Sequence, residues 1–275
     1  MFESPQEYLI WLFSDKIKKK AEELWNWLWG RKKKGEKSSI LIIGPGGTGK
    51  STFGRILADQ YDAILQSLGV YEESIDIETY SLKDDPSVEI IVPPGQEQRR
   101  DFTWSTLGQE ISGGKFRGIV LVGAYGYHSF FGVSFKKHRL YKSGKKEFLQ
   151  AFLKDRRSEE ITVLNELAPF IKACNKKCWL LTLVTKQDLW WRNRAAVDNF
   201  YRIGDYGKII KKIQRGKNTL HHEVVYTSLM IANFKTGEDE LLVKTSPGYD
   251  LEKQISTWKA WFKVFENLKN WEEGK

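Results

Sequence analysis

The strongest chemical signal in the sequence is a glycine-rich stretch that ends in Lys50 and Ser51. Residues 40–52 read Ile-Leu-Ile-Ile-Gly-Pro-Gly-Gly-Thr-Gly-Lys-Ser-Thr, so an apolar run leads directly into the pattern G-x-x-x-x-G-K-S. This pattern is typical of a phosphate-binding loop, whose backbone N–H groups surround phosphate oxygens at the start of a helix. We expect Lys50 to reach the β- and γ-phosphates and the Ser51 hydroxyl to bind Mg²⁺. The predicted phosphate-binding residues of this loop are Gly44, Pro45, Gly46, Gly47, Thr48, Gly49, Lys50, Ser51 and Thr52.

Three shorter motifs follow apolar runs further along the chain. Residues 92–96 read Val-Pro-Pro-Gly-Gln and continue the apolar run at 88–92. Residues 185–188 read Thr-Lys-Gln-Asp and follow the apolar run at 178–184, and Thr-Ser-Leu at 227–229 ends a third apolar run. Each motif is weak by itself. Their order after a phosphate-binding loop is what makes them informative.

In this order and setting, the four motifs resemble those of the Ras-like, translation-factor-related P-loop small GTPases. The resemblance implies that Asp188 accepts hydrogen bonds from guanine N1–H and the 2-amino group, a donor pair that adenine lacks. It implies that the Lys186 stem lies along the base and that Thr185 ties its loop to the phosphate-binding loop. It also implies that the backbone N–H of Ser228 contacts guanine O6, with Leu229 in the same loop.

The same resemblance assigns roles around the γ-phosphate. Gly95 is expected to donate its N–H to the γ-phosphate, and Gln96 resembles the glutamine that orients the attacking water. Val92 stands where the family carries an aspartate that supports the Mg²⁺ shell, so this departure puts magnesium affinity and turnover in question. The further metal ligand expected from the family is Ser74 or, as the second choice, Thr79.

The pattern of apolar runs predicts an α/β protein with a P-loop GTPase fold. We expect a mostly parallel six-stranded sheet with helices on both faces, in which only the strand at 76–82 is antiparallel. The nucleotide is expected at the carboxyl ends of the strands, where all four motifs lie. The resemblance covers about residues 38–232. The six strands are expected to begin near residues 40, 76, 88, 118, 179 and 224.

The chain is expected to divide into an N-terminal segment and one large domain. Residues 1–37 predict an amphipathic, Trp-rich helix with a basic linker. Residues 38–275 predict the GTPase-like domain, with insertions near 124–147 and 235–250 and a C-terminal helix. The first helix can pack on the domain, or residues 5–34 can contact an anionic membrane surface. Amphipathicity alone leaves both interpretations open.

Three local patterns give further expectations. The segment 124–147 mixes aromatic and basic residues, which favours a packed loop with a basic edge over a nucleic-acid surface. Ser158, just after Arg157, predicts the start of a new helix. Cys174 and Cys178 have a spacing that fits one helix face and lack nearby histidines, which argues against a metal site.

Composition limits the class of protein and its partners. The 275 residues carry 44 Lys and Arg against 35 Asp and Glu, a net charge of +9, which fits a nucleotide or an anionic surface as partner. Two cysteines form no disulfide framework, and neither a membrane span nor a signal peptide is visible, so a cytoplasmic location is expected. Nucleic acid is the less favoured partner.

Together these features predict a protein that binds GTP or GDP with Mg²⁺ and hydrolyses GTP slowly as a molecular switch. Lys50 and Gln96 are the predicted catalytic residues, and a protein effector is an expected partner. The alternative is a binding module that holds the nucleotide without useful turnover and recruits a partner or a membrane through its N-terminal helix.

Overall fold

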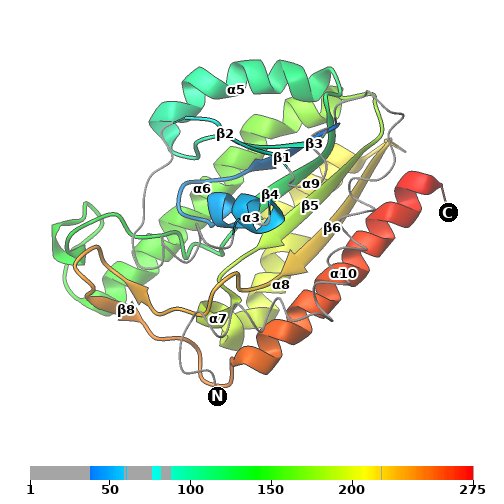
Figure 1. Cartoon of the computed structure of the whole chain (residues 1–275). Coiled ribbons are helices and arrows are strands. Elements are labelled where there is room, and N and C mark those ends of the chain that lie inside the picture. The colour runs from blue at the N-terminus through cyan, green and yellow to red at the C-terminus, as the bar shows by residue number, and fades with distance from the viewer. Residues whose placement is uncertain (1–37, 59, 61–75, 82–87, 218, 275) are drawn as a thin grey trace.

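A six-stranded sheet forms the centre of the structure, which is a computed structural model that describes residues 38–58, 60, 76–81, 88–217 and 219–274. The strand order is β2-β3-β1-β4-β5-β6 (Figure 1). β2 runs antiparallel to β3, and the other four pairings are parallel, as predicted. The strands are β1 (Ser38–Ile43), β2 (Glu78–Ser81), β3 (Val88–Val92), β4 (Phe116–Gly123), β5 (Cys178–Val184) and β6 (Leu220–Tyr226).

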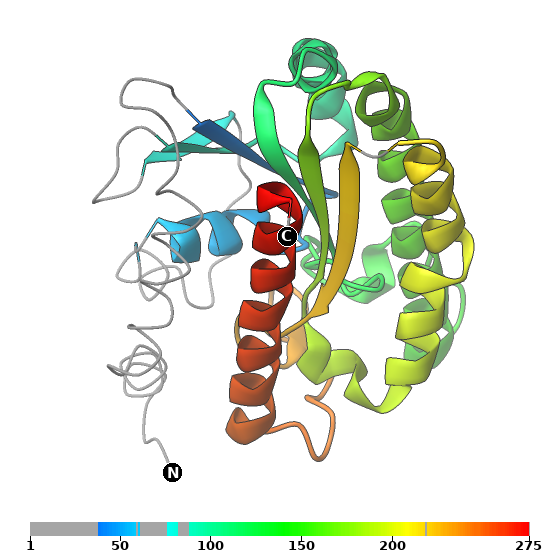
Figure 2. The same ribbon diagram turned by 90° about the vertical axis from the view of Figure 1, so that its right-hand side faces the viewer.

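Helices cover both faces of this sheet, which confirms the predicted α/β fold class (Figure 2). Side chains alternate along each strand, so Ile40 and Ile42 face one layer while Leu41 and Ile43 face the other. The first layer contains α3 (Lys50–Leu57) and α10 (Leu251–Glu273). The second contains α5 (Glu97–Ser112), α6 (Lys145–Ala173), α8 (Arg194–Arg202) and α9 (Asp205–Gln214).

The parallel pairing places the predicted motifs at one edge of the sheet. β1, β3, β5 and β6 all point the same way, so the loops that follow their last residues meet at that edge. These are the four loops that carry the sequence motifs. The short helix α7 (Gln187–Trp190) begins within the third of them.

The predicted new helix at Ser158 is wrong, because α6 is one continuous helix of 29 residues. Ser158 is exposed and donates a hydrogen bond from Oγ to the Lys154 carbonyl, one turn earlier, at 3.1 Å. The buried face of α6 runs past this position, from Phe148 and Phe152 to Leu164 and beyond. Burial of that face therefore overrides the local capping signal.

The two cysteines do not share a helix face, which corrects that expectation. Cys174 caps the C-terminus of α6, and Cys178 is the first residue of β5. Both thiols are free and buried. β6 begins at Leu220, a few residues earlier than predicted, because Leu220 pairs with Cys178 across the parallel ladder.

The segments added around the sheet are packed against it. In the loop after β4, Phe130 and Phe135 are buried against Phe148 of α6, as expected for a packed loop. The segment expected near 235–250 forms a small antiparallel hairpin of β7 (Phe234–Lys235) and β8 (Leu241–Val243).

The C-terminal helix packs on the sheet, as predicted. Trp258, Trp261 and Leu268 of α10 are buried in the same cluster as Phe53 of α3. Among the helices that the structure describes, none is long and apolar enough to cross a bilayer. The predicted helix in residues 1–37 lies outside the described residues.

Candidate nucleotide-binding site

The phosphate-binding loop is held in shape by its own side chains and by one neighbouring loop. Gly47 and Gly49 have φ of 73° and 96°, a left-handed conformation that favours glycine. Thr48 Oγ1 donates to the Pro45 carbonyl at 3.0 Å. A Cβ atom on Gly47 would lie 2.6 Å from the Ser129 nitrogen, which donates to the Gly47 carbonyl at 3.0 Å. These contacts within the protein define the shape of the loop.

Lys50, the first residue of α3, supplies a buried positive charge to this loop. Its Nζ donates to the Pro45 carbonyl at 2.9 Å. Burial lowers the pKa of Lys50 to about 8, although the carboxylates of Glu78 and Glu159 oppose that shift. A buried ammonium that donates to a neutral carbonyl is an unfavourable arrangement that an anion would relieve. The loop is thus electrostatically suited to a phosphate.

Gly95 and Gln96 lie against the phosphate-binding loop, where the sequence places the γ-phosphate. Gly95 accepts a hydrogen bond from the Gly46 N–H at 3.1 Å, and a Cβ atom on Gly95 would collide with Lys50 Nζ. Gln96 is the N-cap of α5, and a Cβ atom on Gly46 would lie 3.6 Å from its Cγ. Gln96 Oε1 is buried and accepts no hydrogen bond from the part of the chain that the structure describes.

The residues expected to bind the metal do not all lie together. Ser51 and Thr52 lie half-buried in the first turn of α3. Val92 is completely buried in an apolar cluster and offers no metal ligand. Thr79 is exposed in β2 on the side opposite to buried Tyr80, so its side chain points away from α3. Ser74 lies outside the described residues.

The loop after β5 contacts the phosphate-binding loop directly. Thr185 Oγ1 donates to the Thr48 carbonyl at 2.7 Å and lies 3.1 Å from the Gly123 carbonyl. Lys186 Nζ donates to the Gly47 carbonyl at 2.9 Å and to Ser129 Oγ at 3.2 Å. Burial lowers the pKa of Lys186 to about 8. The Thr-Lys pair therefore joins two of the predicted motifs.

Asp188 is held by the loop after β6. Ser228 Oγ donates to Asp188 Oδ1 at 2.5 Å and accepts the Asp188 N–H at 2.8 Å. The Ala232 N–H donates to Oδ2 at 3.1 Å. Burial raises the pKa of Asp188, and these hydrogen bonds partly oppose that shift. Leu229 closes the gap to the phosphate-binding loop, because a Cβ atom on Gly49 would lie 3.3 Å from its Cδ1.

The C-terminal part of the chain supports these two loops. The Ser246 N–H donates to the Asp188 carbonyl at 2.7 Å. Gln254 of α10 donates from Nε2 to the Ser228 carbonyl at 2.7 Å. Within the loop after β5 itself, Trp190 Nε1 of α7 donates to the Thr185 carbonyl at 2.8 Å. The hairpin segment and α10 therefore position the motifs, which short motif patterns do not reveal.

A buried carboxylate on α6 fixes the loop after β4. Glu160 Oε1 accepts hydrogen bonds from the Ala124 N–H at 3.1 Å, the Gly126 N–H at 3.0 Å and His128 Nε2 at 2.9 Å. Glu160 Oε2 accepts a hydrogen bond from the Tyr201 hydroxyl at 2.5 Å. Since Ser129 of this loop contacts Gly47, Glu160 indirectly positions the phosphate-binding loop.

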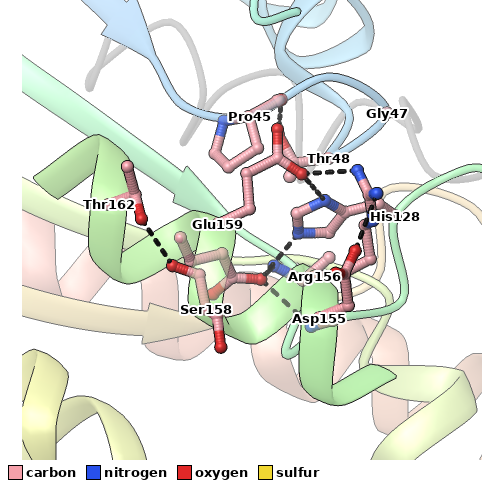
Figure 3. A network of polar contacts seen from close by, with 12 residues as sticks. Pro45, Gly47, Thr48, His128, Asp155, Arg156, Ser158, Glu159 and Thr162 are labelled. Carbon is pink, nitrogen blue, oxygen red and sulfur yellow. Dashed lines mark hydrogen bonds and ion pairs between the residues drawn. The ribbon is translucent and has the colours of Figure 1, made fainter. Parts of the chain in front are cut away.

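The adjacent carboxylate, Glu159, extends from α6 toward Pro45 and lies close to His128 and Arg156 (Figure 3). Its oxygens lie 2.6 Å from Arg156 Nη1, 3.7 Å from His128 Nδ1 and 3.9 Å from Arg100 Nη2. Burial opposes ionisation, yet His128, Arg156 and Arg100 together hold the pKa of Glu159 below its usual value. This network connects α5, α6 and the loop after β4.

Sequence reasoning missed this support, although one signal was available. Glu160 lies on the apolar face of α6, one turn before Leu164 and two turns before Leu167. A charged residue on such a face requires buried partners. Its partners in the loop after β4 are distant in sequence, so only the tertiary structure identifies them.

Comparisons with known proteins give matches among solved structures alone. No protein-family model and no curated protein matches the sequence. Solved structures do match, and one is the small COPII coat GTPase SAR1 from Encephalitozoon cuniculi in complex with GDP, at 15% identity and a TM-score of 0.41 over 98% of each chain. Another is the GDP form of the signal recognition particle receptor SRb from Chaetomium thermophilum, at 14% identity and a TM-score of 0.38 over 84% of this chain and 97% of that one.

The GTP-bound T. brucei IFT22/74/81 structure also matches, at 17% identity and a TM-score of 0.34 over 82% of this chain and 98% of that one. At TM-scores this low, the fold assignment rests on the strand order and on the loops that follow β1, β3, β5 and β6. By these criteria the chain has the P-loop small-GTPase fold in a divergent form.

Proposed function

We propose that the chain binds GTP and GDP at the loops after β1, β3, β5 and β6, with Mg²⁺ at Ser51. The observation that carries this proposal is the placement of Asp188. Its carboxylate is buried and anchored through Ser228, and Thr185 and Lys186 of its own loop are hydrogen-bonded to the phosphate-binding loop. A buried carboxylate at this place has capacity for the N1–H and 2-amino donors of guanine.

Calorimetric titration with GTP, GDP and ATP tests this proposal. We expect the wild-type chain to prefer guanine nucleotides, because ATP leaves the buried Asp188 carboxylate without its base donors. Asp188→Asn should weaken GDP binding by about 100-fold or more. The same variant should gain affinity for xanthosine diphosphate, whose carbonyl replaces the 2-amino group and accepts from the Asn amide. Equal binding of ATP and GTP by the wild-type chain would contradict the proposal.

The proposed reaction is slow hydrolysis of GTP. Lys50 would neutralise charge on the β- and γ-phosphates, and the Gly95 N–H would bind the γ-phosphate. Gln96, which lies beside Gly46 with its Oε1 unpartnered among the described residues, would hold the attacking water. Bound Mg²⁺ would supply further charge neutralisation at the phosphates.

A second candidate function is nucleotide binding without useful turnover, which the buried, apolar Val92 favours. In this case the chain would act as a recruitment module for a protein effector or, through residues 5–34, for a membrane surface. Multiple turnover of GTP by the purified chain, abolished in Lys50→Ala, would exclude this candidate. Flotation of the full chain with anionic vesicles, compared with a chain that begins at Ser38, tests the membrane contact.

A further inference from the structure

Three neighbouring loops carry basic residues at the edge of the sheet opposite to the proposed nucleotide site. They precede β4, β5 and β6, which are adjacent parallel strands, so all three loops meet at the amino ends of these strands (Figure 1). The last turns of α6 and α9 reach the same edge, because these helices lead into the second and third loops. We call seven basic residues of this edge the amino-edge patch: Lys172, Lys176, Lys177, Lys211, Lys212, Arg215 and Lys217.

The loops contact one another, which brings their basic residues into one surface. Lys217 Nζ donates to the Cys174 carbonyl at 2.6 Å, so the loop before β6 is joined to the loop before β5. A Cβ atom on Gly114 would lie 2.5 Å from Lys176 Cδ, which places the loop before β5 against the loop before β4. The amino-edge patch is therefore continuous across the ends of three strands.

Neighbouring carboxylates do not neutralise this patch. Segments 172–177 and 211–217 contain no acidic residue. Within the described residues, no member of the patch forms an ion pair, and every member except the half-buried Lys217 is exposed. Two carboxylates lie nearby, but Glu110 pairs with Lys115 at 2.6 Å and Glu272 pairs with Arg117 at 2.5 Å. The positive charge of the patch therefore remains available to an external anion.

Helix ends explain part of this arrangement. Lys172, Lys211 and Lys212 lie in the last turns of α6 and α9, where positive charge interacts favourably with the helix dipole. Lys176 and Arg215 lie beyond those last turns and add like charges to the same surface. Mutual repulsion among these charges opposes the folded arrangement, and an anionic partner would relieve it.

The residue types fit an anionic lipid surface better than a nucleic acid. Lysines predominate, and their compact, hydrated ammonium groups are attracted to a charged bilayer without the bidentate phosphate contacts that arginine makes. The aromatic ring beside the patch, Trp271, contacts Lys177 and is stacked on His221 at 5.4 Å between ring centroids, so it is engaged within the protein. The exposed large apolar side chains of the described residues all lie outside these segments, so binding should be electrostatic.

The N-terminal part of the chain joins the domain at this same edge. β1 is parallel to β4 and begins at Ser38, so its first residue lies at the amino ends of the strands. Residues 31–34 read Arg-Lys-Lys-Lys. The four steps from Lys34 to Ser38 span at most about 14 Å of chain. A further basic run is therefore attached close to the edge that carries the patch.

We propose that the amino-edge patch binds the anionic surface of a lipid bilayer by electrostatic attraction. This inference goes beyond the proposed nucleotide binding and does not depend on it. It also differs from a membrane contact through residues 5–34, because it assigns the contact to side chains of the folded domain. With the patch against lipid, the loops after β1, β3, β5 and β6 would face away from the bilayer.

Flotation of the full chain with phosphatidylcholine vesicles that contain about one third phosphatidylserine tests the proposal. The test variant combines Lys172→Gln, Lys211→Gln, Lys212→Gln and Arg215→Gln, whose wild-type side chains are all exposed. Its affinity for these vesicles should fall by about 100-fold, because each basic residue near such a surface contributes about fivefold. Wild-type binding should also weaken steeply as the salt concentration rises from about 0.05 to about 0.5 M.

The matched control loses four exposed lysines at the opposite edge of the sheet. It combines Lys136→Gln, Lys137→Gln, Lys142→Gln and Lys146→Gln, in the loop after β4 and the first turn of α6. The net charge changes by the same amount, so the control should bind the vesicles within about threefold of the wild type. Wild-type affinity in the test variant would overturn the proposal, and so would an equal loss in the control.

Two further measurements complete the test. Equal binding of the wild-type chain to phosphatidylcholine vesicles without phosphatidylserine would overturn the proposal. Fluorescence anisotropy with a labelled RNA or DNA duplex covers the other polyanion. If the test variant loses duplex binding but keeps its vesicle binding, the patch binds nucleic acid and the proposal is wrong.

A smaller variant keeps the test decisive if the fourfold variant does not fold by circular dichroism. Lys211→Gln with Lys212→Gln changes two exposed side chains of α9, and Lys136→Gln with Lys137→Gln is its control. The first pair should lower vesicle affinity by about tenfold or more relative to the second. Equal affinities of the two double variants would overturn the proposal.

Discussion

The two ends of the proposed nucleotide site differ in how fully their buried polar groups are hydrogen-bonded within the protein. At the guanine end, both carboxylate oxygens of Asp188 accept hydrogen bonds, and Thr185 and Lys186 are hydrogen-bonded to the phosphate-binding loop. At the phosphate and metal end, Lys50 is buried with its pKa lowered and Gln96 Oε1 has no partner among the described residues.

This difference indicates that the two ends contribute differently to the proposed nucleotide binding. The proposed guanine end is organised by contacts within the protein, so under the proposed function it should select the base. The proposed phosphate end retains buried polar groups that a bound phosphate would satisfy, so ligand binding should stabilise this end more. Variants at the two ends should therefore change different measurements, namely base preference at one end and magnesium dependence at the other.

The largest expected effect comes from the support that both ends share. Glu160→Gln replaces one carboxylate oxygen with an amide NH₂ group. That group is a donor and cannot accept the hydrogen bonds that reach Glu160 in the wild type. The free energy of unfolding should fall by about 3 kcal/mol, measured by urea denaturation. GDP binding should weaken as well, because the loop after β4 contacts both Gly47 and Lys186.

Glu166→Gln is the control for this prediction, since Glu166 is exposed on the same helix and loses the same charge. It should leave the unfolding free energy within about 0.5 kcal/mol of the wild-type value. Equal stability of the Glu160→Gln and Glu166→Gln variants would show that the buried network does not hold the loop.

A smaller effect is expected when the guanine end alone is disturbed. Ser228→Ala removes the hydroxyl that donates to Asp188 Oδ1 and accepts its N–H. GDP affinity should fall by about tenfold, corresponding to about 1–2 kcal/mol for a buried hydrogen-bonded group. The factor by which Mg²⁺ tightens binding should stay unchanged. A loss of that factor in Ser228→Ala would show that the two ends are not independent.

The smallest effect is a dependence on pH, to which each end contributes one lysine. Burial lowers the pKa of both Lys50 and Lys186 to about 8 in the nucleotide-free chain. Above that pH Lys50 loses the charge that attracts phosphate, and this loss alone should lower GDP affinity about threefold from pH ~7 to pH ~8.5. Lys50→Arg keeps its charge and should remove the contribution of the phosphate end.

Stability of the nucleotide-free chain should change in the opposite direction. Between about pH 8 and the ordinary value of 10.5, the unfolded chain binds more protons at these lysines than the folded chain does. The contribution of these lysines to the free energy of unfolding therefore rises with pH in this window. Urea denaturation of the wild type and of Lys50→Arg across this window measures that contribution, and a contribution that falls with pH would contradict the prediction.

Part of the site was predictable because its residues lie close together in short segments of the sequence. The phosphate-binding loop needs glycines at consecutive positions, and Gly47 and Gly49 indeed adopt positive φ. The link from Thr185 to that loop was implied by the family resemblance and is confirmed at 2.7 Å. The contacts of Ser228 with guanine and of Gly95 with phosphate stay predictions.

The errors arose where local signals competed with tertiary packing. Ser158 resembles a helix start, but the buried face of α6 continues through it. The spacing of Cys174 and Cys178 fits a helix, but the chain turns between them into β5. In both cases the burial of neighbouring apolar residues stabilises more than the local preference does.

The sequence by itself determined the fold class, the strand directions and the position of the glycine-rich loop after β1, because these follow from periodicity and from residue types close together in the chain. Only the tertiary structure decided which distant side chains support that loop. Glu160 reaches the loop after β4, and Glu78 comes opposite Val92, through packing and strand register. Strand register and helix packing join residues that sequence spacing does not relate, so these neighbours become known only from the folded chain.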